Sequence, residues 1–446
     1  MTNILSVEFL QFTVRAALFC CAATAAISPV FGSADTLESK RPNIVLLLAD
    51  DLGFADLGSY GSEINTPSID RLAASGMRFS NFHVAASCAP TRAMLMTGLD
   101  SHTAGGANIP EAIPEDQAHA PAYQGVLKTD IPTVAEMLQS VGYRTLMSGK
   151  WHLGFSDGEK PSERGFDRTL MLADTGADNW RQRSYLPIYA EANWFEDGEP
   201  TTLPENFYSS EYLVDKAIEY IGNRSQQPFF AYVAFQAVHI PVQAPAAFRD
   251  KYLQSYTGGW HDLRKARSEG LARTGVLPAV LEGREMPTTP AWQSLSAEQQ
   301  AFEARGMAVY AGMVDAMDFH VGRLIEHIEK IGELDNTVFI FLSDNGAEGS
   351  IVTRHQAPDS KAPVAPFQLW MRLVDYNTDA QTLGERDSYH DIGPAWASAA
   401  VGPLSWYKFF AGEGGLRVPL VISGAHGGVS VVPQEAGGVS PALGWA

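Results

Sequence analysis

Four apolar runs, each followed directly by polar residues, constrain the fold of this chain more than any other feature of its sequence. The first run is Asn43–Ala49, and the others cover residues 143–147, 229–238 and 338–342. Continuous apolar runs are typical of strands that are covered on both faces of a sheet. We therefore expect these runs to be buried, neighbouring and mostly parallel strands.

The segments between these runs carry the end signals of helices. Thr66 and Pro67 suit the cap and first turn of a helix that Gly76 closes, and Pro132 falls in the first turn of a helix predicted over 130–142. Two more helices are predicted, one capped by Ser209 or Ser210 and ending at Gly222, and a long one over about 301–332. This alternation predicts an α/β fold with a doubly wound, mostly parallel sheet flanked by helices.

Each apolar run leads into residues that can do chemistry. Doubly wound sheets bind ligands beyond the carboxyl ends of their strands, where these residues fall. For one cluster alone the ordinary alternatives stand, because paired aspartates are common turn formers and a histidine after a strand is often only a hydrogen-bonding residue. Four clusters together favour a functional site. They contain Asp50 and Asp51, Lys150 and His152, His239, and Asp344 and Asn345.

Four of these residues, Asp50, Asp51, Asp344 and Asn345, offer only oxygen ligands. Oxygen ligand sets select calcium or magnesium, and calcium tolerates an irregular, bidentate arrangement better. Zinc prefers histidine and cysteine ligands, and no pair of histidines has the spacing of a zinc site. The sequence therefore predicts a divalent cation, calcium in preference to magnesium.

Of the three cysteines, Cys20 and Cys21 lie in the N-terminal apolar stretch, which leaves Cys88 alone in the rest of the chain. A lone cysteine is most often a small buried apolar residue. Here Pro90 suits the first position of a helix, so Cys88 is predicted near a helix N-terminus, where anions and an activated nucleophile are favoured. Arg92, one turn later, could bridge residue 88 to an anion.

Residues 1–34 are predicted to be an export signal, because Arg15 precedes an apolar stretch that ends in small residues. We therefore expect a periplasmic or extracellular protein, without a stable membrane span. The formal net charge is −19, with 32 basic and 51 acidic residues. That balance argues against nucleic acid as a partner, since phosphate binding needs a basic face.

Five motifs stand in one order along the chain. They are ADDLGF at 49–54, CAPTR at 88–92, GKWHLG at 149–154, SDNG at 343–346 and KFFAGEGGLRVP at 408–419. Cys88 to Arg92 resembles the C-x-P-x-R signature of the sulfatase family, within the alkaline phosphatase superfamily. The resemblance extends over 42–424, and it is closest to bacterial arylsulfatases and alkylsulfatases that depend on formylglycine. It implies an alkaline phosphatase-like catalytic domain that hydrolyses aryl or alkyl sulfates or a sulfated glycan.

The resemblance also implies how the site works. Cys88 would be oxidised to formylglycine by a separate formylglycine-generating enzyme. One hydroxyl of the hydrated aldehyde would attack sulfur while the alcohol departs, and the other would then expel sulfate. A calcium ion would be bound by residue 88 together with Asp50, Asp51, Asp344 and Asn345.

The same resemblance gives roles to five further residues. Arg92 and Lys150 would steady the formylglycine, and His152 would take its proton. His239 would protonate the leaving group or orient the ester, and Lys408 would hold a sulfate oxygen with Lys150. A solvated surface lysine is the alternative for Lys408.

Two parts of the chain depart from the pattern. Residues 251–300, rich in turns and charges, are predicted to be a surface insertion, and residues 425–446 form a Gly-rich, atypical tail. Because the resemblance fades after Gly424, we expect the smaller C-terminal subdomain of the family to be missing through a frameshift, a premature stop or an incomplete gene model. Two alternatives to an active sulfatase remain open. One is a phosphonate monoester or phosphodiester hydrolase of the same superfamily, and the other is an inactive truncated sulfatase.

Overall fold

The computed structural model describes residues 41–284, 286–352 and 366–424. The predicted export signal and the atypical tail lie outside the described residues. The described residues contain a nine-stranded sheet with the order β2-β9-β8-β1-β7-β3-β4-β5-β6. Its strands are β1 (Asn43–Ala49), β2 (Met77–His83), β3 (Arg144–Lys150), β4 (Arg168–Leu172), β5 (Trp194–Glu196), β6 (Glu199–Pro200), β7 (Phe229–Ala234), β8 (Thr337–Ser343) and β9 (Arg417–Ser423).

The centre of the sheet is parallel and its two edges are antiparallel. Strands β8, β1, β7, β3 and β4 run in one direction. At one edge β9 and β2 are added by antiparallel pairing, and at the other β5 and β6. The predicted α/β fold with a mostly parallel sheet is confirmed.

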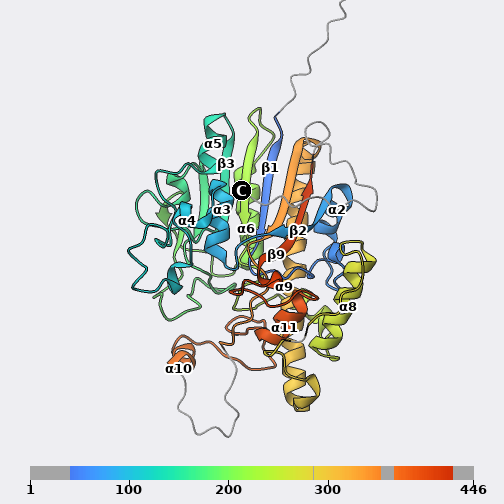
Figure 1. The fold of residues 1–446 in the computed structure, drawn as a ribbon. Helices are drawn as coiled ribbons and strands as arrows, with labels where there is room; N and C mark the ends of the chain where they lie inside the picture. The colour runs from blue at the N-terminus through green and yellow to red at the C-terminus, as the bar shows by residue number, and fades with distance from the viewer. Residues whose placement is uncertain (1–40, 285, 353–365, 425–446) are drawn as a thin grey trace, which may run out of the picture. The chain divides into compact units, whose positions relative to one another are not determined.

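Alternate residues of β1 enter two separate hydrophobic cores, as the two-residue period of a strand requires. Val45 and Leu47 join a core that includes side chains of α2 (Pro67–Ser75), α6 (Ser209–Ile221) and α9 (Ala297–Lys330). Leu46 and Leu48 join the other core, with side chains of α3 (Cys88–Thr97), α4 (Ser101–Ala104) and α5 (Val134–Ser140). Helices therefore cover both faces of the sheet (Figure 1).

The remaining helices lie mostly in connections that follow the central strands. They are α7 (Ala246–Arg249), α8 (Trp260–Arg273), α10 (Pro366–Leu373), α11 (Gly393–Ala400) and α12 (Glu413–Leu416). Within 251–300, helix α8 packs against α11, and Trp260, Trp292 and Trp396 contact one another edge to face, with ring centroids 4.7–5.7 Å apart. None of the helices in the described part of the chain is long and apolar enough to cross a membrane.

Two strand ends differ from the prediction. Strand β3 continues through Ser148 and Gly149 to Lys150. These residues are buried; the first two remain paired with both β4 and β7, and Lys150 remains paired with β4. Strand β7 ends at Ala234, although the apolar run continues to Val238. Beyond Ala234 the backbone bonds to the segment after β1, as Val238 N does to Asp50 O at 2.6 Å.

The helix starts also differ in detail. Pro132 precedes α5, which begins at Val134 with Thr133 and Glu136 as a capping box. Tyr208, and neither of the two serines, is the cap residue of α6. Thr66 occupies the cap position of α2 without capping it, because Asp318 of α9 accepts the first backbone N–H groups instead, at 3.0 and 2.8 Å.

Candidate active site

The paired aspartates after β1 and the Asp-Asn pair after β8 lie beside each other because these strands are parallel neighbours. The register joins Ala49 to Ser343, so the next residues of both strands leave the sheet at the same place. Asp51 has a φ of 64°, a left-handed conformation that is uncommon outside glycine. Its backbone N–H donates to Asp344 Oδ1 at 3.2 Å, and this bond joins the segment after β1 to the segment after β8.

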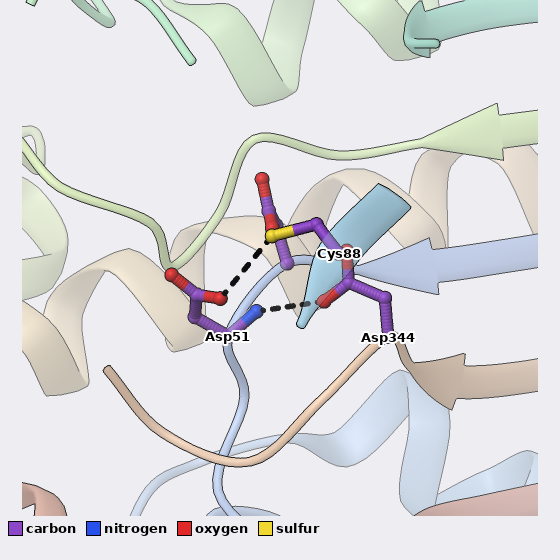
Figure 2. Close-up of side chains that lie close together, drawn as sticks. Asp51, Cys88 and Asp344 are labelled. Carbon is purple, nitrogen blue, oxygen red and sulfur yellow. Dashed lines mark hydrogen bonds between the residues drawn. The ribbon is translucent and has the colours of Figure 1, made fainter. Parts of the chain in front are cut away.

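A compact set of potential metal ligands results. One ligand atom from each of Asp50, Asp51, Cys88 and Asp344 lies within 4.8 Å of every other, and all four residues are fully buried. Figure 2 shows Asp51, Cys88 and Asp344 converging, with Cys88 Sγ donating to Asp51 Oδ1 at 3.8 Å. The predicted ligands are therefore brought together, with Asn345 bonded to Asp51 Oδ1 at 2.7 Å.

Two oxygens in this set test whether a cation fits. Asp50 Oδ1 and Asn345 Oδ1 are buried, and no hydrogen-bond donor reaches either of them from the described residues. Buried oxygens without a donor are costly unless something positive lies beside them. Because the donors are mainly hard oxygens, the residues fit calcium or magnesium.

The charges of the site support the same conclusion. Four buried carboxylates, on Asp50, Asp51, Asp344 and Glu348, meet three cationic side chains, on Arg92, Lys150 and Lys408, which leaves one excess negative charge. Burial raises the pKa of Asp50 to about 8, although Lys150 opposes this shift. A divalent cation would supply the charge that keeps all four carboxylates ionised.

Cys88 is the first residue of α3, and Ser87 occupies the cap position. The predicted helix start at Pro90 is thus two residues late, since Pro90 is the third helical residue. Burial raises the pKa of the Cys88 thiol well above its ordinary value, and Lys150 and Lys408 do not offset it. Cys88 thus lies at a helix N-terminus as predicted, and its burial favours the neutral thiol there.

Arg92 and Lys150 connect the helix to the carboxylates. Arg92 donates twice to Asp344 Oδ2, from Nε at 2.9 Å and Nη2 at 2.7 Å, and once to the Lys150 carbonyl at 2.7 Å. Lys150 Nζ donates to Asp50 Oδ2 at 2.6 Å. Both side chains are fully buried and ion-paired, Arg92 with Asp344 and Asp50, and Lys150 with Asp50.

Lys408 belongs to the site and is not a surface lysine, since it is only 3% exposed. Its Nζ lies 2.8 Å from Asp51 Oδ1 and 3.1 Å from Glu348 Oε2. Sequence reasoning missed Glu348, although it lies two residues after the SDNG motif. The centroid of the Phe409 ring lies 5.1 Å from the buried amine, and this ring is half-exposed at the surface.

The two predicted histidines are both present and both buried. His239 Nδ1 lies 2.6 Å from the Ile240 carbonyl, and its Nε2 lies 3.7 Å from Asp51 Oδ2. Burial lowers the pKa of His239, and Lys408 and Lys150 lower it further. Burial also lowers the pKa of His152 to about 4, against the opposing charge of Glu111.

The loop after Asp51 is held by a second buried charge cluster around Asp56. Asp56 accepts from Gly53 N at 2.7 Å, from the Tyr310 hydroxyl at 2.7 Å and from Arg267 of α8 at 2.5 Å. Sequence reasoning missed this cluster, because Arg267 and Tyr310 are each more than 200 residues from Asp56. It ties the metal-ligand loop to α8 and α9.

Replacing Tyr310 by phenylalanine is expected to lower the free energy of unfolding by about 1.5–3 kcal/mol, because a buried hydrogen bond to a charged group is lost. Urea unfolding measures this loss. Tyr220→Phe is the matched control, since its hydroxyl donates at 3.0 Å to the partly exposed Glu196. Equal losses in the two variants would contradict a special role for the Asp56 cluster.

The fold and the site together are those of an α/β enzyme with a buried acidic centre, able to hold a cation, at the carboxyl ends of its parallel strands. A family model described as Sulfatase matches residues 42–439. The chain belongs to the sulfatase family, whose members are sulfuric ester hydrolases.

Individual relatives agree with this assignment. The chain is 39% identical over 402 residues to an uncharacterized sulfatase of Schizosaccharomyces pombe, covering 86% of this chain and 70% of the relative. It is 30% identical over 434 residues to an arylsulfatase of Klebsiella aerogenes, covering 95% and 90%. A crystal structure of Ps i-CgsB in complex with k-i-k-neocarrahexaose matches with a TM-score of 0.55 and 25% identity, over 86% of this chain and 66% of that one.

Proposed function

We propose that this protein hydrolyses sulfate esters to an alcohol and inorganic sulfate, with residue 88 as formylglycine and calcium as the bound cation. The observation that carries the proposal is the convergence of Cys88, three cationic side chains and four carboxylates in one buried centre. Hydrated formylglycine would supply a hydroxyl nucleophile for sulfur and a second hydroxyl for release of sulfate. The S–O bond of the ester breaks, and the oxygen added to sulfate comes from water.

The cationic side chains supply the electrostatic part of this chemistry. Lys150 Nζ donates to Asp50 and Lys408 Nζ donates to Asp51, and Arg92 lies one turn after Cys88 in the same helix. A sulfuryl group in transfer carries negative charge on its outer oxygens, which fixed cations stabilise without reorganisation. A cation held by Asp50, Asp51, Asp344 and Asn345 would add Lewis-acid stabilisation.

The histidines can move protons at defined atoms. A backbone carbonyl only accepts, so His239 Nδ1 carries the hydrogen and Nε2 is left to exchange a proton with the leaving group. His152 is also buried close to Lys150 and Arg92, whose charges favour its neutral, proton-accepting form. These assignments agree with acid and base work by two separate histidines.

The test has two parts, both on protein made together with a formylglycine-generating enzyme. The mass of the tryptic peptide Phe79 to Arg92 reports whether Cys88 is converted. Turnover is then compared for an aryl sulfate, a sulfated sugar and a phosphonate monoester. Conversion with sulfate release supports the proposal, a preference for phosphonate favours the related hydrolase, and conversion without turnover of any substrate favours an inactive protein.

The substrate class follows from the relatives only as a proposal. One relative is an arylsulfatase, and another was crystallised with a neocarrahexaose. Both aryl sulfates and sulfated glycans therefore belong in the substrate panel. The half-exposed ring of Phe409 beside Lys408 would suit an apolar leaving group or the face of a sugar ring.

Calcium is expected to raise the melting temperature of dialysed protein, and a chelator is expected to reverse the increase. Stabilisation should reach about 2.7 kcal/mol at a calcium concentration 100 times Kd, and magnesium should give less. Asn345→Leu removes a ligand oxygen without changing charge, so it should lose most of this effect. Equal stabilisation of the variant and the parent protein would argue against a cation at this centre.

A further inference from the structure

Glu111 lies outside every sequence motif and yet contacts a predicted catalytic histidine. It belongs to a short 3-10 turn, Pro110–Ala112, and its side chain is only 10% exposed. One carboxylate oxygen, Oε2, lies 3.0 Å from His152 Nε2, and the other, Oε1, accepts a hydrogen bond from the Tyr189 hydroxyl. Glu111 therefore joins the segments that contain His152 and Tyr189.

This contact determines which nitrogen of His152 carries its hydrogen. Burial disfavours ionisation of Glu111, but His152 and Tyr189 outweigh it and hold the pKa of Glu111 at about 2, so the carboxylate can only accept. His152 Nε2 must then be the donor. Its Nδ1 is left without a hydrogen in the neutral ring, and this atom is buried with no hydrogen-bond partner among the described residues.

We propose that Glu111 is a positioning residue for His152, fixing the tautomer in which Nδ1 is free to accept a proton, and that Tyr189 holds Glu111 in place. The inference rests on the proposed function, because it assumes that His152 acts as a base in that reaction. His152 also has a φ of 57°, a left-handed conformation that is uncommon outside glycine and that the surrounding structure must hold. A carboxylate partner that sets a histidine tautomer is a general device of acid–base catalysis.

A direct contact between Glu111 and the substrate is the competing role. It is disfavoured by charge, because a carboxylate repels the sulfate group of an ester. It is also disfavoured by occupancy, because each carboxylate oxygen already has a partner inside the protein. The two roles differ in what a substitution changes: a positioning residue affects kcat through His152, whereas a substrate contact affects KM.

The experiment uses matured protein whose formylglycine content is known from the mass of the 79–92 peptide. Glu111→Gln keeps the shape but can donate as well as accept, so it no longer enforces one tautomer. We expect kcat to fall about 100-fold, within the range of a lost acid–base contribution, with KM within about twofold. Glu111→Asp should recover part of the loss, and Tyr189→Phe should cost about tenfold or less.

The decisive measurement is the pair Glu111→Gln and His152→Ala, alone and combined. If Glu111 acts only through His152, the double variant should be no slower than His152→Ala within about twofold. The inference would be overturned if the losses of the two single variants multiplied in the double variant. It would also be overturned if Glu111→Gln changed only KM, or left kcat unchanged. Glu115→Gln, an exposed residue of the same loop, is the matched control and should behave as the parent protein.

The failures of the two ideas can be told apart. If the parent protein contains formylglycine and releases no sulfate, the proposed function fails. If the parent protein is active and Glu111→Gln is equally active, only the inference fails. Melting temperatures with and without calcium show whether each variant is folded, and Glu111→Asp provides a second reading should the glutamine variant be unstable.

Discussion

Alanine at position 88 is expected to lower sulfate-ester turnover by about 10,000-fold or more. The substitution removes the only residue from which a formylglycine nucleophile can be made in this centre, and loss of a nucleophile typically costs more than loss of any supporting group. Initial rates with an aryl sulfate at saturating concentration measure the effect. Residual activity within about tenfold of the parent protein would exclude residue 88 as the nucleophile.

A control is needed because Cys88 is also adjacent to the cation-binding oxygens. Cys88→Ala removes one sulfur from a fully buried position and leaves Asp50, Asp51, Asp344 and Asn345 unchanged. The variant should therefore still be stabilised by calcium. Loss of activity together with retained stabilisation assigns the effect to chemistry and not to collapse of the centre.

Lys408→Met is expected to have the second-largest effect, and it should act on both activity and stability. Losing the fixed positive charge of the Lys408 amine should lower kcat by about 100- to 1000-fold. The substitution also leaves Asp51 and Glu348 facing each other without the amine that lies 2.8 and 3.1 Å from them. Breaking a buried charge pair in this way typically costs about 3–5 kcal/mol, which urea unfolding measures.

A second substitution separates these two effects. Adding Glu348→Gln to Lys408→Met removes one of the two uncompensated carboxylates, so stability should recover in large part. Activity should not recover, because the Lys408 amine that is proposed to hold a sulfate oxygen is still missing. Recovery of both would mean that Lys408 serves the fold alone, and recovery of neither would mean that Asp51 dominates the cost.

The sequence predicts the central strands well because their apolar runs are covered on both faces. The first run coincides with β1, Asn43–Ala49. The ends of β3 and β7 were wrong by three or four residues, since burial continues where pairing stops at Ala234, and pairing continues through the polar Ser148. Hydrophobicity reports burial, and at the centre of this sheet burial and strand pairing end at different residues.

The site was predicted to the extent that its residues directly follow strands or belong to short motifs. The supporting residues were not, because nothing local distinguishes them. Glu111 is 41 residues from His152 in a loop of ordinary composition, and Arg267 reaches Asp56 across 211 residues. Such partners are selected by the folded arrangement, and only their location in space reveals what they do.

The strand order has a consequence for the time course of synthesis. Strand β1 leaves the ribosome first among the central strands, yet its partners β7 and β8 follow late, with Ile44 paired to Phe230 and Asn43 to Thr337. At about 5–20 residues per second, β1 waits many seconds for its neighbours. Cys88 is fully buried in the folded protein, where a modifying enzyme would not reach it. If Cys88 is converted as proposed, the converting enzyme would therefore have to act before β1 pairs with β7 and β8 and the centre closes.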